Sequence, residues 1–236
     1  MDEAKNSDPY QFENFNAFFT RELKQGARTI CTDPYTISCP ADGVISQLGI
    51  INDDDIFQAK GEYYSTTTLL ADSDLASNYS NGSFATIYLS PKDYHRIHMP
   101  LSGRLMSMTY VPGELFSVNQ TTAENVSNLF ARNERLVCHF ETEYGPMAMV
   151  LIGAMIVAGI ETTWSGQVTP PMGAIKNQYF SGLPKEIILQ QGEEMGRFKL
   201  GSTVILLFTE NTVQWHNNLH AGSPTKMGDL IATAII

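Results

Sequence analysis

Residues 147–160 read MAMVLIGAMIVAGI, which is the most apolar stretch of the chain. A helix that crosses a bilayer needs about 20 apolar residues, and this stretch is shorter. Its two glycines and its β-branched side chains favour strands over a helix. We therefore expect a pair of buried strands or a core segment here, in a chain that does not span a membrane but can still lie against one.

Similar short runs, apolar or rich in β-branched residues, extend on both sides of this stretch from Ile37 onward. Gly, Pro, Asn and Asp separate them, which is typical of strands joined by turns. Helical interruptions are expected at 65–71 and at 121–133, where Thr121-Thr122-Ala123-Glu124 fits a capping box. Strands are expected at residues 43–48, 85–89, 103–111, 136–140, 149–160, 165–168, 186–189, 203–208 and 230–235.

The N-terminal region carries a different pattern. Its apolar side chains recur at helical spacing, which predicts an amphipathic helix within residues 10–25 that ends at Gly26. The aromatic face of this helix either packs on the core of the domain or touches lipid. The residues of this face are Phe12, Phe15, Phe18, Phe19 and Leu23.

Together these patterns predict an α+β fold that is mainly β. We expect a β-rich sandwich or barrel-like core, an N-terminal amphipathic helix and a few short helices. No linker or internal repeat is evident, so residues 1–236 are expected to form a single domain. Hydrophobic residues make up 43% of the chain and charged residues 17%, which excludes intrinsic disorder.

Charge and cysteine content narrow the partners and the compartment. The formal net charge of −10 argues against nucleic acid as a partner and against strong electrostatic attraction to an anionic membrane. The three cysteines, Cys31, Cys39 and Cys138, form no CxxC pair. This usage is typical of a reduced, cytosolic compartment in which thiols pack and do not react.

The segment Asp93-Tyr94-His95-Arg96-Ile97-His98 gathers two of the five histidines beside an acid and a base. Pro91 and Pro100 flank it and disfavour a helix. On an extended segment His95 and His98 point to opposite faces, which weakens the interpretation of the pair as metal ligands. A functional role is favoured over a purely structural one.

Two further segments are ambiguous on local sequence alone. Asp42 precedes Gly43, and an Asp-Gly pair is usually a turn. The Gly201-Ser202 pair precedes an apolar strand and is also typical of a turn. The surrounding residues fit neither the phosphate-binding loop nor the Gly-x-Ser-x-Gly elbow.

These segments together resemble the phosphatidylserine decarboxylase family, most closely its bacterial type. The matches follow the family's order over most of residues 10–210, and the Leu-Gly-Ser-Thr element combined with YHRIHMP is the most specific part. The matching stretches are FNAFFTRELK (15–24), PADGVISQLG (40–49), YLSPKDYHRIHMP (88–100), YVPGELFSVN (110–119), NLFARNERLV (128–137), IGAMIVAGIET (152–162) and GEEMGRFKLGSTVILLF (192–208).

The resemblance implies a zymogen that cuts itself between Gly201 and Ser202. The β-chain would be 1–201 and the α-chain 202–236, with Ser202 converted to a pyruvoyl group, so that no external cofactor is needed. Attack of the Ser202 hydroxyl on the Gly201 carbonyl requires a base, and by motif this base is His98, oriented by Asp42.

The implied activity is that of a lyase that converts phosphatidylserine to phosphatidylethanolamine and CO2 in phospholipid biosynthesis. The pyruvoyl carbonyl forms a Schiff base with the serine amine and acts as an electron sink. His95 is the implied proton donor and headgroup contact. Arg96 is a further candidate for substrate binding, and Asp93 a second choice as a supporting residue. No metal is expected.

The resemblance also implies partners and a location. The substrate lies in the membrane, so we expect a peripheral protein on the cytoplasmic side of the cell membrane. Cleaved α- and β-chains would form a heterodimer, and two of these a dimer. Family members usually carry further amphipathic N-terminal helices, which we do not find in this chain. Because the charges of the N-terminal region nearly cancel, apolar insertion would contribute more than charge.

Three alternatives stay open at this point. The first is a zinc hydrolase that uses His95, His98 and Asp42, although the ligand spacing is weak. The second is a lipid-binding β-domain without catalysis. The third is the same chemistry on another amino-acid headgroup or on a soluble amino acid.

Overall fold

The computed structural model describes residues 1–155, 159–169, 173–199 and 202–235. Its short helices are η1 (Pro9–Gln11), α1 (Phe15–Phe19), α2 (Thr66–Leu70), α3 (Ser73–Ser77), α4 (Gln120–Ala123) and α5 (Leu129–Arg132). Its strands are β1 (Thr36–Ser38), β2 (Gly43–Ile50), β3 (Asp55–Ala59), β4 (Glu62–Ser65), β5 (Ser83–Leu89), β6 (Arg96–His98), β7 (Gly103–Val111), β8 (Arg135–Thr142), β9 (Gly145–Ile152), β10 (Ile160–Thr162), β11 (Gly166–Gln167), β12 (Lys176–Tyr179), β13 (Ile188–Leu189), β14 (Glu194–Phe198), β15 (Ser202–Phe208), β16 (Val213–Trp215), β17 (Pro224–Thr225) and β18 (Leu230–Ala234).

A nine-stranded antiparallel sheet forms the centre of the fold. Its order is β12-β7-β8-β9-β15-β5-β2-β17, and β13 also pairs with β7. A four-stranded sheet (β11-β10-β14-β6) and a three-stranded sheet (β1-β18-β16) accompany it, and β3 and β4 form a separate pair. The predicted fold class, an α+β fold that is mainly β, is confirmed.

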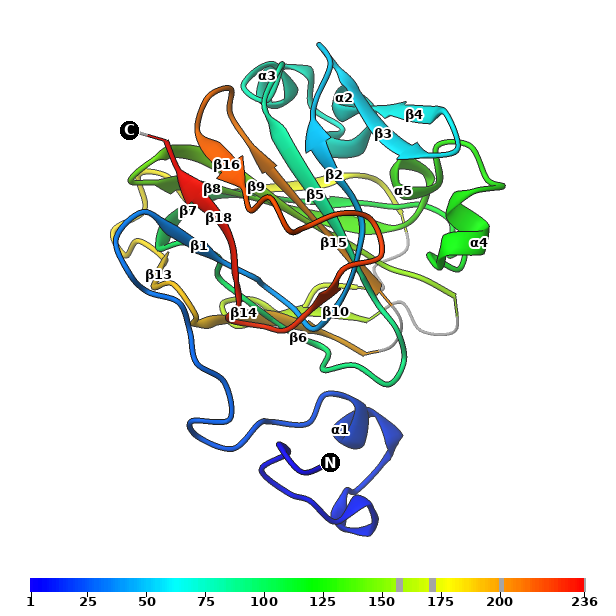
Figure 1. Ribbon diagram of the computed structural model, residues 1–236, viewed down its shortest axis with the longest axis vertical. Coiled ribbons are helices and arrows are strands. Elements are labelled where there is room, and N and C mark those ends of the chain that lie inside the picture. The colour runs from blue at the N-terminus through cyan, green and yellow to red at the C-terminus, as the bar shows by residue number, and fades with distance from the viewer. Residues whose placement is uncertain (156–158, 170–172, 200–201, 236) are drawn as a thin grey trace.

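Both faces of the large sheet are buried, because residues of its central strands alternate between two hydrophobic clusters. On β15, Val204 and Leu206 enter the first cluster, whereas Ile205 and Leu207 enter the second. The two smaller sheets close the first cluster, and α2, α3, α5 and the β3–β4 pair close the second. Figure 1 shows α2 and α3 above the long strands and β6 and β14 below them.

The sequence predicted most long strands of the large sheet, but it missed β1, β3, β4, β6, β12, β14, β16 and β17. β7 has the predicted bounds, and β15 begins one residue before the expected start. The apolar stretch at 147–160 supplies most of β9 and the first residue of β10, while residues 156–158 lie outside the described part. Cys39 and Cys138 are buried free thiols, as the packing interpretation expects.

Two helix predictions are wrong in extent. The helix expected within 10–25 is only α1, because the side chain of Asn14 caps its start and it already ends at Thr20. The helix expected at 121–133 is two short helices, α4 and α5, since Asn128 adopts a left-handed conformation (φ 57°) between them. Asn119 caps α4, in place of the predicted capping box at Thr121.

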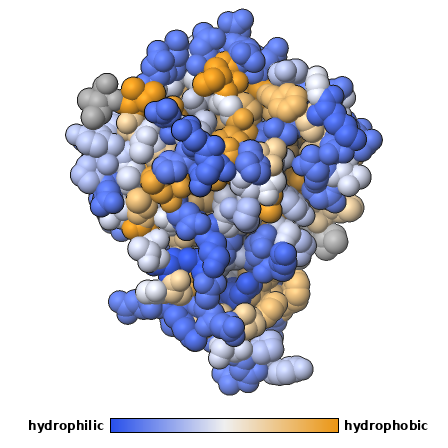
Figure 2. Space-filling model, in the orientation of Figure 1, coloured by the Kyte–Doolittle hydropathy of each residue, from blue (hydrophilic) through white to orange (hydrophobic). Residues whose placement is uncertain are grey.

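Residues 1–30, here called the N-terminal segment, lie beside the sheets as an extended appendage that carries α1 (Figure 1). Its surface is mostly hydrophilic with a hydrophobic patch on one side (Figure 2). The aromatic rings of Phe12, Phe15 and Phe18 contact one another, whereas Phe19 is buried. No helix of the described residues is long and apolar enough to cross a membrane.

Candidate active site

Three distant parts of the sequence meet at one end of the large sheet. The first residue of β15, Ser202, pairs with Leu89, the last residue of β5. On the other side of β5, Val44 pairs with Tyr88, which places Gly43 beside Leu89 and Asp42 just beyond the sheet. After Leu89 the chain turns and supplies the histidine segment. The topology therefore gathers the candidates that the motifs singled out.

Ser202 occupies a closed environment at this end of the sheet. Its side chain is fully buried, and among the described residues its Oγ has no hydrogen-bond partner. A buried hydroxyl without a partner is energetically costly, and Ser202 shares this feature with other buried hydroxyls, such as that of Thr203. Leu200 and Gly201, the other side of the predicted cleavage site, lie outside the described residues.

His95 is the second fully buried polar side chain at the site. Its Nδ1 lies 2.9 Å from the carbonyl oxygen of Asp93 and therefore carries the proton, because a carbonyl can only accept. Its Nε2 has no partner among the described residues, and its ring packs against Phe19 with centroids 3.9 Å apart. Burial lowers the pKa of His95 to about 4, so the ring is neutral at pH 7.

His98 is held at both ring nitrogens. Its Nδ1 donates to the carbonyl of Gly192 at 2.8 Å, and its Nε2 accepts from the hydroxyl of Tyr94 at 3.0 Å. Burial lowers the pKa of His98, with the carboxylates of Glu194 and Asp42 acting in the opposite direction. The imidazole is thus a neutral base whose lone pair at Nε2 faces Tyr94.

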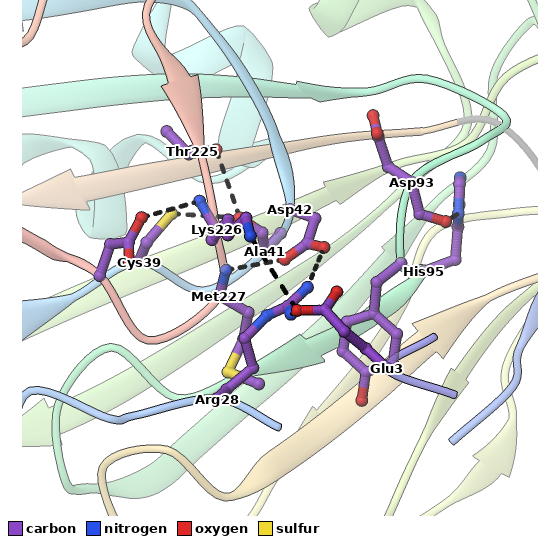
Figure 3. A network of polar contacts seen from close by, with 12 residues as sticks. Glu3, Arg28, Cys39, Ala41, Asp42, Asp93, His95, Thr225, Lys226 and Met227 are labelled. Carbon is purple, nitrogen blue, oxygen red and sulfur yellow. Dashed lines mark hydrogen bonds and ion pairs between the residues drawn. The ribbon is translucent and has the colours of Figure 1, made fainter. Parts of the chain in front are cut away.

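Asp42 is bound by groups other than histidine. Its Oδ2 accepts from Arg28 Nη2 at 2.5 Å and its Oδ1 from the backbone N–H of Met227 at 2.8 Å. Figure 3 shows Arg28 between Asp42 and Glu3, to which it also forms an ion pair. The hydrogen bond between Asp42 and His98 that the motif suggests is absent from the described contacts, so the orienting role of Asp42 stays a prediction.

Arg96 and Asp93 connect the site to its surroundings. Arg96 forms an ion pair with Glu194 at 2.7 Å and donates from Nε to the carbonyl of Thr20 at 2.9 Å. Asp93 Oδ2 accepts from the backbone N–H of Ser90 at 2.7 Å, which fixes the turn after β5. Arg96 and His98 line a pocket of about 400 Å³ beneath the N-terminal segment.

Sequence reasoning missed Arg28 and Tyr94 as partners of the site. Arg28 belongs to no motif and reaches Asp42 only because the N-terminal segment folds back onto the sheet. Tyr94 lies inside the histidine segment Asp93–His98, so its closeness to His98 in the sequence could have indicated this contact. Among the described residues, no three His, Cys, Asp or Glu side chains gather to hold a metal ion, and the zinc alternative gains no support.

Comparisons with known proteins agree with the motifs. The profile of the phosphatidylserine decarboxylase family matches residues 15–233. The phosphatidylserine decarboxylase proenzyme of Ectopseudomonas mendocina is 58% identical over 236 residues, which covers 99% of this chain and 82% of that protein. The proenzymes of Pseudomonas aeruginosa PAO1 (58% over 98% of this chain and 81% of that protein) and Pseudomonas putida W619 (59% over 100% and 83%) are similar.

The family profile spans nearly the whole chain, and the identities far exceed what a shared fold requires. The same residues that the profile covers build the sheet end at which Ser202, Asp42 and the two histidines gather. The chain belongs to the phosphatidylserine decarboxylase family.

Proposed function

We propose that this chain is a self-processing, pyruvoyl-dependent phosphatidylserine decarboxylase. It cuts itself between Gly201 and Ser202 into a β-chain (1–201) and an α-chain (202–236), and it releases CO2 and phosphatidylethanolamine. The observation that carries the proposal is the buried Ser202 Oγ, which has no partner among the described residues, at the sheet end where Asp42 and the histidine segment lie.

The residues at this position fit a pyruvoyl group. A serine whose side-chain hydroxyl is buried and has no partner among the described residues is a suitable precursor, because conversion removes that hydroxyl. When formed, the group supplies an electrophilic carbonyl that reacts with an amine and accepts the electrons released on decarboxylation. Burial of residue 202 excludes water from that carbonyl.

His98 is the proposed base for self-cleavage. Its lowered pKa keeps it neutral at pH 7, which a proton acceptor needs. The Asp42 carboxylate slightly opposes the lowering of the His98 pKa, which is consistent with the proposed supporting role of Asp42. Nε2 must exchange the Tyr94 hydroxyl for that of Ser202 during the reaction, so Tyr94 is a proposed relay or gate for this nitrogen.

His95 is the proposed proton donor and headgroup contact in decarboxylation. Its Nε2 is an unprotonated, unpaired nitrogen in a site closed by Phe19. Such a nitrogen can bind a proton that arrives with the substrate and return it to carbon after CO2 has left. Arg96 is the proposed cationic group for the headgroup phosphate.

The proposed location is the cytoplasmic face of the cell membrane, with the N-terminal segment toward the lipid. Tyr10 and Phe15 are 94% and 59% exposed and stand at its outer surface. Exposed aromatic side chains of this kind insert at the headgroup level. The cleaved chains are proposed to remain together as an αβ unit, and two units to form a dimer.

Intact mass under denaturing conditions tests the proposal. Purified protein is expected to give two fragments divided before residue 202, the smaller with a pyruvoyl mass at its start, and to release CO2 from phosphatidylserine vesicles. Ser202→Ala is expected to remain a single chain without activity. Ser83→Ala, which removes a buried hydroxyl at the opposite end of the same strand pair, is the control and is expected to cleave.

A single chain of 26.2 kDa from the wild type would contradict maturation of this protein alone. CO2 release by the Ser202→Ala variant would overturn the pyruvoyl mechanism itself.

A further inference from the structure

Besides Asp42, a second carboxyl residue, Glu134, lies level with Ser202 across the strands of the large sheet. Thr203 pairs with Ile152, and Arg135 pairs with Ile152 from the other side. Continuing both registers by one residue places Ser202, Gly153 and Glu134 side by side on three neighbouring strands. The backbone N–H of Gly153 donates to the carbonyl of Glu134 at 2.8 Å, which confirms the Gly153–Glu134 part of this alignment. The Ser202–Gly153 part follows from continuing the β15–β9 register.

All three residues face the same side of the sheet. Side chains alternate along a strand, so residues two apart share a face. Ser202, Gly153 and Glu134 each lie two positions from a residue of the first hydrophobic cluster, namely Val204, Leu151 and Leu136. The hydroxyl of Tyr110, a member of the same cluster, donates to Glu134 Oε2 at 2.9 Å.

The residue between Ser202 and Glu134 has no side chain. A Cβ at Gly153 would lie 3.7 Å from Glu134 Oε1. Directly opposed residues of an antiparallel pair have Cβ atoms about 5 Å apart, so Glu134 Oε1 lies within about 9 Å of the Ser202 Cβ. The space above Gly153 therefore lies between Glu134 Oε1 and residue 202, and the side chain of Leu115 borders it, 3.6 Å from the same Cβ position.

Glu134 is a buried carboxyl without an opposite charge. It is 6% exposed, its Oε1 has no hydrogen-bond partner, and no described Lys, Arg or His forms an ion pair with it. The neighbouring Arg135 donates to the backbone carbonyls of Leu69, Thr68 and Asn133 instead. Burial raises the pKa of Glu134, and the nearby hydroxyls of Tyr110 and Thr169 oppose this effect. A buried carboxylate that lacks a cation is suited to receive one with the substrate.

We propose that Glu134 is a further catalytic residue, which binds the ammonium group of the substrate above Gly153 and takes one proton from it. The substrate class is a compound that carries a primary amine and a carboxylate on neighbouring positions. This inference rests on the proposed function. The step moves one proton from the substrate –NH3⁺ to the –COO⁻ of Glu134, which gives –NH2 and –COOH and conserves charge. The freed nitrogen lone pair is the nucleophile that a carbonyl at residue 202 would require. A carboxyl with a raised pKa is better matched to this transfer than an exposed one.

Glu134→Gln is the central variant, because the amide keeps an oxygen for Tyr110 but cannot ionise. The matched control is Glu114→Gln, which removes an exposed carboxylate that pairs with Arg132. Both variants are first tested for self-cleavage, which is expected to be normal. If the wild type does not cleave, the proposed function fails, and this inference is then judged by the binding measurement alone.

The binding measurement uses uncleaved Ser202→Ala protein and isothermal titration with dihexanoyl phosphatidylserine and its N-acetylated analogue. The amine-bearing lipid is expected to bind more tightly than the N-acetylated one. Adding Glu134→Gln is expected to reduce the ratio of the two affinities about tenfold, which is in the range of a lost charged hydrogen bond. Gly153→Ala, which places a methyl group in the same space, is expected to weaken binding although the carboxyl remains. An unchanged preference for the amine in both variants would overturn the proposal.

A second measurement uses the cleaved protein. Cyanoborohydride traps the same soluble lipid covalently on residue 202, and the mass of the 202–236 fragment then reports the rate of this capture. In Glu134→Gln the capture rate is expected to fall about a hundredfold near pH 6 and to recover as pH rises, because free amine then forms without a base. A purely structural Glu134 would lower the rate equally at every pH. That parallel profile would contradict the proposed proton transfer.

Discussion

At the scale of single residues, the neutral state of His95 has a consequence for stability. Its pKa of about 4 in the folded protein lies below the ordinary value of 6.5, because the ring is buried. Between these two values the unfolded chain binds more protons than the folded one, so stability falls as pH decreases through this window. The loss from His95 alone amounts to at most about 3 kcal/mol.

This pH dependence can be measured by urea unfolding of the uncleaved Ser202→Ala protein at several pH values between about 7 and 4. Adding His95→Gln, which cannot take up the proton, is expected to flatten the dependence. Adding His220→Gln, at an exposed position, is expected to leave it unchanged. An equally steep loss of stability in the His95 variant would show that other groups dominate, such as the half-buried His98 and His139, whose pKa values partial burial also lowers.

At the scale of elements, the start of β2 sets the position of Asp42. Gly43 has no room for a side chain, because a Cβ there would overlap the carbonyl oxygen of Tyr88 on β5. Gly43→Ala is therefore expected to cost about 1–3 kcal/mol and to slow self-cleavage by displacing Asp42. Mass spectrometry over time and thermal unfolding measure the two effects.

Gly49→Ala is the matched control on the same strand. A Cβ at Gly49 meets only Phe84 at 3.6 Å, an ordinary contact, so this variant is expected to fold and cleave normally. Equal behaviour of the two variants would show that close packing of β2 against β5 is unimportant for the site.

Elements also show how far the sequence predicts this structure. The short apolar runs predicted β7 and β15 to within a residue, because strands that are buried on both faces read as nearly continuous apolar segments. The helix at 10–25 was overestimated, since the same aromatic spacing is satisfied by rings that stack on one another around α1. The family and the decarboxylase identity are confirmed by the comparisons.

The motifs predicted which residues gather at the site but not what holds them. Arg28 is the partner of Asp42 because of how the N-terminal segment folds back, and no local pattern encodes that contact. Glu134 stands in the matched stretch NLFARNERLV, yet its relation to Ser202 depends on the register of three strands. The proposed roles of Ser202, His98, Asp42 and His95 stay predictions.

At the scale of the whole molecule, the net charge of −10 decides how the protein can meet a lipid surface. Electrostatic attraction to anionic lipid is unfavourable, so the proposed membrane binding would depend on aromatic insertion. Replacing Tyr10 and Phe15 by Ser is expected to reduce sedimentation with vesicles, and about 0.5 M NaCl is expected to reduce it little, because salt screens charge and not apolar contact.

Tyr179→Ser is the control for this experiment, since Tyr179 is 67% exposed on β12 and far from the N-terminal segment in sequence. Equal loss of vesicle binding in both variants, or abolition by salt, would contradict insertion by the N-terminal segment.

The position of β15 in the large sheet determines the order in which folding and the proposed cleavage can occur. The strand lies between β5 and β9, and all seven of its residues are buried. A cut before Ser202 leaves this strand as the first part of the smaller fragment, which also supplies β16, β17 and β18 to three sheet positions. Under the proposed cleavage, the chain would therefore fold before it is cut, and the two fragments would not part without unfolding. Once unfolded, they must find each other again by collision, so recovery depends on protein concentration and the intact precursor becomes the only efficient route to the native fold.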